Sequence, residues 1–279
     1  MITAPHRAGA DRGLAGLVRQ HPVAAFVCIA FGTTWLLAVP LITDTVPDGF
    51  HLVVSVGPTI GALVVTGIVA GRSGIRVLGR RVTDWRRVPG WRWWVASISP
   101  LVYLALAAAA LMVVDGLPPG LDWTSSFGGD GWMMGLVGAS LAFGVFEEIG
   151  WRGFLLPRLQ VGRSASAAST GVWAIWAAWH APMFLYHFDF GAIGAIGWLV
   201  GLYFGTVFLT ILHNSTAGSL SSVMLFHVTF NFATILGGAL SDMLASAITT
   251  LVVVATIVAA RRGGPTDLSW HGRHTIVDP

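Results

Sequence analysis

The chain has 279 residues, of which 54% are hydrophobic and only 10% are charged, and its formal net charge is +3. A soluble globular domain carries about 25% charged residues, so this composition excludes a soluble fold, which could not cover its surface with so few charges. A bilayer removes that requirement, and the composition therefore predicts an integral membrane protein. The single cysteine, Cys28, excludes an internal disulfide.

Apolar runs long enough to cross a membrane recur along the chain. A helix needs about 20 apolar residues to span a hydrocarbon core of ~30 Å, and about eight runs meet that requirement. In chain order they are 22–43, 51–70, 93–114, 131–148, 169–187, 191–212, 217–240 and 243–260. Polar residues interrupt the fourth and fifth. The sequence predicts an all-α polytopic membrane helix bundle, with one transmembrane domain over 1–262 and a polar C-terminal tail over 263–279.

The charges of the connecting segments alternate between two kinds. Arginines lie in the N-terminal tail and in 71–92, 152–163 and 261–262, whereas aspartates lie in 44–48, 115–130, 189 and 242. Arginine concentrates on the cytoplasmic side of a membrane, so every second connection is predicted to be cytoplasmic. Both termini are then cytoplasmic, and we expect the protein to be integral to the cell (plasma) membrane.

Two further sequence patterns indicate how the chain contacts the membrane and how its helices pack, and not where a catalytic site lies. The segment 71–92 mixes seven arginines with tryptophans, and we expect it to lie along the cytoplasmic interface or to serve as an ordinary positive loop. Small residues repeat at helical spacing in 57–61 and in 197–205, as Gly-x-x-x-Gly. Such spacing predicts close packing between helices.

The only two glutamates form an adjacent pair at the cytoplasmic end of the fourth run. An ionisable residue inside a bilayer costs roughly 2.5–3.5 kcal/mol on insertion scales, so its presence needs a reason. Glu148 and Arg152 are four residues apart and can pair on one helix face. Glu147 points about 100° away and is left available as a base. The alternative interpretation is a charge cluster that only marks the membrane boundary.

Two more polar pairs follow on later helices. Trp176 and His180 lie one turn apart in the fifth run, and His227 and Asn231 lie one turn apart in the seventh. A packed hydrogen-bonding histidine and an interhelical hydrogen-bonding pair are the alternative interpretations.

One shared site explains these groups more economically than three separate structural roles. At 1.5 Å per residue, His180 and His227 lie roughly 15 Å from the cytoplasmic ends of their runs, and Glu147 lies nearer that surface. A cavity open to the cytoplasm would bring them together with Asn231. A carboxylate, two imidazoles and an amide suffice to activate water and to stabilise an oxyanion.

At these residues the chain resembles the CPBP (Abi) family of intramembrane proteases, which are related to the CAAX prenyl endopeptidase. The family pattern is Glu-Glu-x-x-x-Arg, then aromatic-x-x-x-His, then His-x-x-x-Asn on successive membrane helices. This sequence has the three motifs in that order, as EEIGWR at 147–152, WAAWH at 176–180 and HVTFN at 227–231. The resemblance covers about 131–240.

The resemblance implies an intramembrane endopeptidase that uses water as its nucleophile. For this chain the resemblance implies that Glu147 activates the water with help from His180. His227 and Asn231 then hold the tetrahedral oxyanion. A prenylated C-terminal peptide is the substrate class that the family suggests, and other membrane-associated peptides stay open.

The resemblance also implies that Glu148 and Arg152 shape the site as a supporting ion pair. An alternative is a zinc metalloprotease in which Glu147, His180 and His227 bind the metal. The two histidines come from separate helices, however, and not from a short H-E-x-x-H motif. We therefore expect catalysis without a metal or other cofactor.

The expected partners are membrane lipids and a peptide or membrane-protein substrate, with no nucleic acid. Two other classes of function stay open. A transporter of protons or small solutes could use Glu147, His180 and His227 as a relay, although the sequence has no internal repeat. A non-catalytic, immunity-type protein could bind a membrane partner through the same surface. The sequence does not indicate an oligomeric state.

Overall fold

The computed structural model describes residues 13–115, 132–189 and 191–270, and within these ranges every regular element is helical. The elements are α1 (Leu14–Gln20), α2 (Pro22–Ile42), η1 (Asp48–Phe50), α3 (His51–Val54), α4 (Gly57–Thr83), η2 (Trp85–Arg87), α5 (Trp91–Asp115), α6 (Trp132–Gly150), η3 (Trp151–Leu155), α7 (Leu156–Leu159), α8 (Ala165–Trp179), η4 (Ala181–Leu185), α9 (Ala192–Ser215), α10 (Leu220–Leu240) and α11 (Asp242–Asp267). The predicted all-α bundle is confirmed.

Seven stretches of the described residues are long and apolar enough to cross a membrane. They are Pro22–Ile42, Asp48–Thr83, Trp91–Val113, Met133–Leu159, Ala192–Ser215, Leu220–Leu240 and Asp242–Asp267. The fifth expected run, 169–187, differs because α8 has only 15 residues and continues as the 3₁₀-helix η4. Pro182 accounts for this end, since proline lacks an N–H and disfavours helical geometry at the residue before it.

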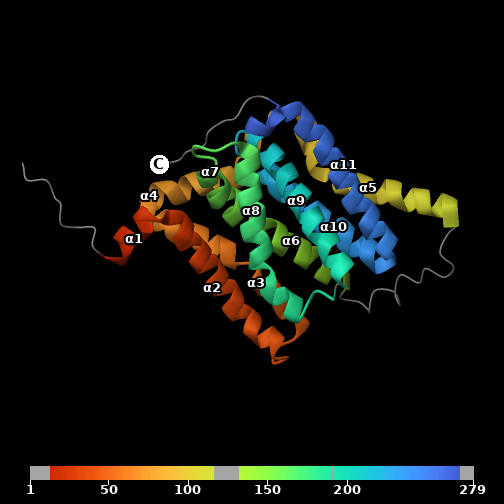
Figure 1. Ribbon diagram of the computed structural model, residues 1–279, viewed down its shortest axis with the longest axis horizontal. Coiled ribbons are helices and arrows are strands. Elements are labelled where there is room, and N and C mark those ends of the chain that lie inside the picture. The colour runs from red at the N-terminus through yellow and green to blue at the C-terminus, as the bar shows by residue number, and fades with distance from the viewer. Residues whose placement is uncertain (1–12, 116–131, 190, 271–279) are drawn as a thin grey trace, which may run out of the picture.

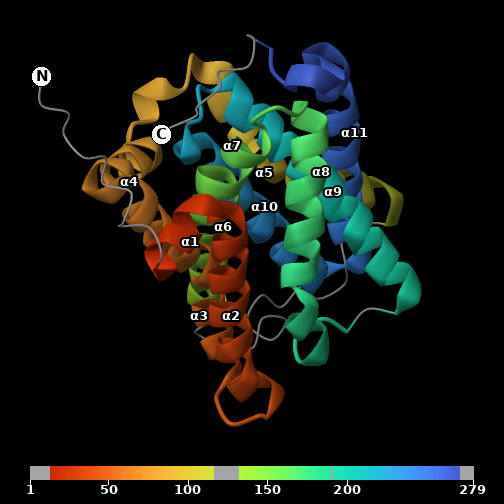
Figure 2. The ribbon, with the colours of Figure 1, turned by 60° about the vertical axis from the view of Figure 1, so that its left-hand side comes forward.

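Helix α10 lies at the centre of the bundle, where it packs against α4, α5, α6, α9 and α11 (Figure 1). The bundle has two distinct ends. Figure 2 shows the connection after α2 and the end of α8 at one of them, away from the arginine-bearing part of α4.

The glycines at 57 and 61 bring α4 against α2. A Cβ atom on Gly57 would lie 2.2 Å from Oγ1 of Thr34, and one on Gly61 would lie 3.1 Å from the ring of Phe26. No larger side chain fits at this distance, so the predicted close packing is confirmed here.

The glycines at 197, 201 and 205 behave differently. A Cβ atom on Gly201 would lie 2.9 Å from Cγ2 of Thr249 on α11, but no heavy atom lies within 4 Å of a Cβ built on Gly197 or Gly205. The prediction of close packing is therefore right for Gly201 and wrong for the other two. Gly201 and Gly205 instead line the cavity described below.

Two glycines with positive φ bend the long helices α4 and α11. Gly71 (φ 62°) interrupts α4 just before its arginines, and Gly264 (φ 66°) interrupts α11. The expected tail therefore begins inside α11, and Trp270 packs on Trp93 with ring centroids 5.2 Å apart. The N-terminal tail before residue 13, the connection 116–131 and the tail beyond 270 lie outside the described residues.

Candidate active site

The two glutamates lie in the last turn of α6, where the helix passes into the π-helical turn η3 and then into α7. Single π-helical turns occur frequently at functional sites. Because the helical path continues to Leu159, Glu147 lies near the middle of the apolar stretch Met133–Leu159. The sequence pattern does not reveal this continuation through η3, and the depth of Glu147 relative to the cytoplasmic boundary stays a prediction.

Glu148 forms a fully buried ion pair. Its Oε1 accepts a hydrogen bond from Nη1 of Arg152 at 2.8 Å, and both side chains have an exposed fraction of 0%. The same oxygen lies 2.7 Å from Nδ1 of His227. The pair expected from the i,i+4 spacing is thus present, and the contact with His227, which comes from α10, was not anticipated.

Glu147 is held apart from that pair by two tryptophans. Its Oε2 accepts hydrogen bonds from the indole N–H of Trp151 at 3.2 Å and from that of Trp176 at 2.5 Å. Sequence reasoning did not give Trp151 a role, although its i,i+4 spacing from Glu147 was a usable signal. Nothing in the sequence indicates the bond from Trp176, because that residue comes from a different helix.

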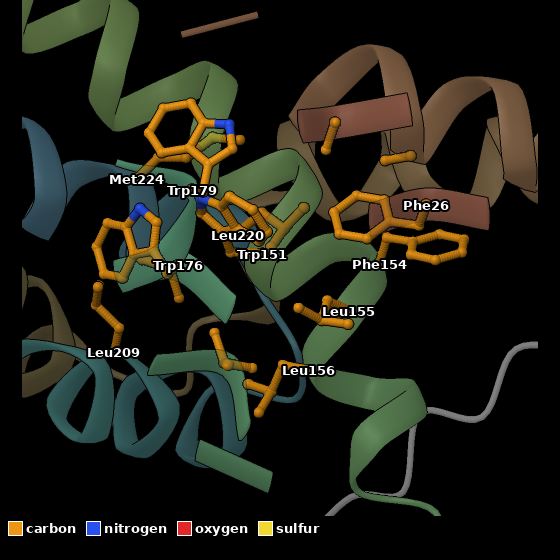
Figure 3. Packing of buried hydrophobic residues seen from close by; sticks show 14 of the residues in the cluster. Phe26, Trp151, Phe154, Leu155, Leu156, Trp176, Trp179, Leu209, Leu220 and Met224 are labelled. Carbon is orange, nitrogen blue, oxygen red and sulfur yellow. The ribbon is translucent and has the colours of Figure 1, made fainter. Parts of the chain in front are cut away.

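Trp176 connects the three motifs. Besides its bond to Glu147, its ring lies 4.6 Å beneath the guanidinium carbon of Arg152 and meets the ring of His227 edge-on at 5.5 Å. A cation over an indole face is favourable, and more so when both are desolvated. Figure 3 shows Trp176 among the buried residues of this core, with Trp151 and Trp179 nearby. The aromatic position of the second motif therefore orients side chains of the other two motifs.

His180 follows the last residue of α8, and its ring orientation is fixed. Its Nδ1 lies 2.7 Å from the carbonyl oxygen of Trp176. Since a carbonyl can only accept, we assign the proton to Nδ1, which leaves Nε2 as the acceptor nitrogen. The rings of Trp179 and Trp198 meet the imidazole edge-on at 4.8 and 5.1 Å.

One cavity of about 430 Å³ is lined by all four residues predicted to be catalytic, Glu147, His180, His227 and Asn231. Most of its remaining wall is aromatic or aliphatic, contributed by Phe143, Met183, Phe188, Trp198, Leu202, Leu209, Phe226, Phe230 and Ile235. The supporting pair lies behind this wall and does not line it. Few polar groups in a mostly apolar cavity are typical of a binding or active site.

A second group of polar residues lines the cavity, and sequence reasoning missed it. His51 of α3 is buried, its Nδ1 lies 2.8 Å from the hydroxyl of Tyr186, and its ring stacks on His187 at 4.0 Å. His51 and His187 both belong to the cavity lining. They lie far apart in the sequence and share no motif, so only the fold reveals their proximity.

The alternative zinc site does not fit this arrangement. Among the described residues, no three His, Cys, Asp or Glu side chains are grouped so that they could hold a metal ion. We therefore derive no step through a metal.

The fold and the site define an integral membrane protein whose bundle holds a carboxylate, two imidazoles and an amide around one cavity. Residues 129–233 match the family model described as type II CAAX prenyl endopeptidase Rce1-like. This match includes all three motifs and confirms the resemblance to the CPBP and CAAX protease family. Among the curated proteins compared with it, none matches the chain.

Proposed function

We propose that this protein is an intramembrane endopeptidase that hydrolyses peptide bonds with a glutamate-activated water. The observation that carries the proposal is the convergence of Glu147, His180, His227 and Asn231 on one cavity. The match to a peptidase family supports the reaction class. Membrane-associated peptides, including prenylated ones, are the substrates to test first.

Glu147, helped by His180, takes up the proton that the attacking water loses as its oxygen bonds to the peptide carbonyl carbon, and returns it to the leaving amine nitrogen as the C–N bond breaks. Both indoles bond Oε2 of Glu147, which leaves Oε1 to accept a proton. The assigned tautomer of His180 provides Nε2 as a second acceptor in the same cavity. A positioned base contributes typically 10²–10⁴-fold to the rate of such a step.

His227 and Asn231 are the groups that stabilise the oxyanion of the tetrahedral intermediate. Nδ1 of His227 lies 2.7 Å from Oε1 of Glu148, so this carboxylate orients the ring that lines the cavity. The amide N–H₂ of Asn231 supplies a second donor one turn further along α10. In this mechanism Glu148 and Arg152 act as positioning residues, because they orient His227 and do not line the cavity.

The test is cleavage of quenched fluorescent peptides, some of them farnesylated, by purified protein in detergent. We expect Glu147→Ala to lower the rate by about 10²–10⁴-fold, the loss expected when a general base is removed. Glu147→Gln is the matched variant, because it keeps an acceptor for both indoles and removes only the base. Thermal unfolding of both variants checks that they fold like the wild type.

Three outcomes decide between the functions considered. Loss of cleavage in both variants, with unchanged unfolding, supports the glutamate mechanism. Loss of wild-type cleavage on adding a chelator, restored by zinc, would replace it with a metalloprotease. Solute flux into liposomes without cleavage of any peptide would replace it with transport.

A further inference from the structure

Helix α4 contacts the first motif, although it lies outside the matched residues 129–233. In the first half of α4, the hydroxyl of Thr59 donates a hydrogen bond to the carbonyl of Phe146, the residue before the glutamate pair. A Cβ atom on Gly150, inside the motif, would lie 2.4 Å from Cβ of Pro58. The first half of α4 therefore holds the motif where α6 ends.

A bend in α4 separates this half from a second half that contacts the same motif. Gly71 has φ 62° and ψ −156°, a conformation that only glycine adopts readily. Beyond the bend, Leu78 lies against the π-helical turn, where a Cβ atom on Gly153 would be 2.9 Å from Cδ1 of the leucine. The second half of α4 thus contacts the turn that follows the glutamates.

Arg81, in this second half, bonds the backbone of the turn. Its exposed fraction is 3%, its Nη1 donates to the carbonyl of Gly153 at 2.9 Å, and its Nη2 donates to the carbonyl of Arg152 at 3.2 Å. Its Nε donates to the carbonyl of Gly218 at 3.0 Å, in the connection that precedes α10. One guanidinium therefore joins the turn of the first motif to the start of the helix that carries His227.

Arg81 also contacts a buried network, which we define as Gln160, His213 and Asn214. Its Nη2 lies 2.7 Å from Nε2 of His213, and because an arginine can only donate, Nε2 is the acceptor and the imidazole proton lies on Nδ1. That Nδ1 donates to Oδ1 of Asn214 at 3.0 Å, and the amides of Asn214 and Gln160 bond each other in both directions. Among the described residues, no hydrogen bond joins these three side chains to the π-helical turn.

The turn that Arg81 bonds carries the side chain of Arg152. That guanidinium donates to Oε1 of Glu148 at 2.8 Å, and the same oxygen lies 2.7 Å from Nδ1 of His227. A shift of the turn would therefore displace the ion pair that orients His227. A misplacement of about 1 Å can lower the rate of a reaction about 10²-fold, even when its cause lies far from the chemistry.

We propose that Arg81 is a positioning residue for the peptidase reaction, because its bonds to the carbonyls of Arg152 and Gly153 fix the π-helical turn that orients the catalytic groups. The inference rests on the proposed function for the reaction that it supports. Arg81 does not line the cavity, so it acts through the turn and not on the substrate. The reaction then depends on α4 as well as on the helices that carry the three motifs.

The test compares Arg81→Met and Arg81→Lys with two controls. Arg80→Met removes the neighbouring arginine, which is exposed, and Asn214→Ala removes a member of the buried network. Amide hydrogen exchange of residues 147–159, measured by mass spectrometry on purified protein in detergent, reports the order of the turn without cleavage. Its rate is divided by that of residues 245–256 in α11, so that a general loss of stability cancels. Steady-state cleavage of the best peptide from the first assay gives kcat and KM.

We expect Arg81→Met to raise this exchange ratio at least tenfold and to lower kcat at least tenfold, with KM within twofold of the wild type. Arg81→Lys keeps the charge, but a single ammonium cannot replace the fork of donors that reaches three carbonyls, so its values should lie between. Both controls should match the wild type in the exchange ratio and in kcat. If Arg81→Met does not fold, Arg81→Lys decides the test.

An unchanged kcat in the folded variant that decides the test would overturn the proposal. An equal rise of the exchange ratio in Asn214→Ala would also overturn it, since the effect would then belong to the buried network and not to the bonds on the turn. If the wild type cleaves no peptide, the proposed function fails, whereas the exchange ratio still decides whether Arg81 holds the turn. The two proposals can therefore fail separately.

Discussion

The only two asparagines of the chain lie in two regions that use polar groups in opposite ways. Asn214, in a buried polar network, bonds Gln160 in both directions, donates to the carbonyl of Asp267 and contacts His213. Asn231 is partly exposed and lines the cavity. The first asparagine directs its polar atoms to the protein, and the second presents them to whatever occupies the cavity.

This difference separates polar residues that hold the fold together from those that can act on a substrate. Inside a membrane a polar side chain is costly unless it is paired, so a fully bonded group has a structural role that accounts for its presence. A group that faces a cavity with free hydrogen-bonding capacity has no such structural role, and its presence indicates a function. The comparison predicts that substitutions in the buried network reduce stability, whereas substitutions in the cavity reduce turnover.

The largest expected effect on stability falls on the ion pair between the two regions. Glu148→Ala removes the partner of a fully buried guanidinium, and we expect it to lower the free energy of unfolding by about 3–5 kcal/mol. Chemical denaturation in detergent measures this loss. The double variant Glu148→Ala/Arg152→Met should recover part of it, because no uncompensated charge remains. A Glu148→Ala variant as stable as the wild type would contradict the pairing.

The next effect concerns turnover. We expect Asn231→Ala to lower kcat by about 10²–10³-fold, the loss seen when one oxyanion donor is removed, while its unfolding stays close to that of the wild type. Steady-state cleavage of the best peptide from the first assay gives kcat and KM separately. A change in KM alone would assign Asn231 to substrate binding instead.

The matched change in the buried network should show the reverse pattern. Asn214→Ala leaves buried partners on Gln160 and His213 without hydrogen bonds, so we expect a loss of about 1–3 kcal/mol in unfolding free energy. Cleavage per folded molecule should not change. The unfolding free energy and the cleavage rate come from the same denaturation and peptide assays. A loss of turnover without a loss of stability would contradict the predicted difference between the two regions.

The smallest effect concerns the indole that holds Glu147. Trp176→Phe keeps an aromatic ring beside His227 and removes one hydrogen bond, worth about 0.5–1.5 kcal/mol, so cleavage should fall about two- to tenfold. Trp173→Phe is the control on the same helix, since its indole bonds the carbonyl of Leu199 away from the cavity. Equal losses in the two variants would mean that the effect is structural.

Local relationships along one helix could be predicted from the sequence, whereas the individual contacts between helices could not. The spacing of Glu148 and Arg152 gave their ion pair, and the apolar runs gave the spans. The sequence also grouped the four residues that line the cavity. Whether a helix continues past a motif, as α6 does, or stops early, as α8 does, depends on packing and on proline, which hydropathy alone does not resolve.

Arg81 is the clearest example of what the sequence lacks. It looks like one more arginine of a basic segment, and instead it turns inward to bond three carbonyls. Counting residues from the helix ends gave a depth for each group but no information on contacts of this kind.

The π-helical turn after the glutamates makes the first motif sensitive to length as well as to residue identity. Such a turn holds an extra residue compared with an α-helical one, and each residue in a helix accounts for about 100° of rotation. A deletion within Trp151–Leu155 would therefore rotate α7 away from its neighbours even if both glutamates and Arg152 were kept. Redesigned or recombined versions of this chain should tolerate insertions in the connections between helices far better than a one-residue change in this turn.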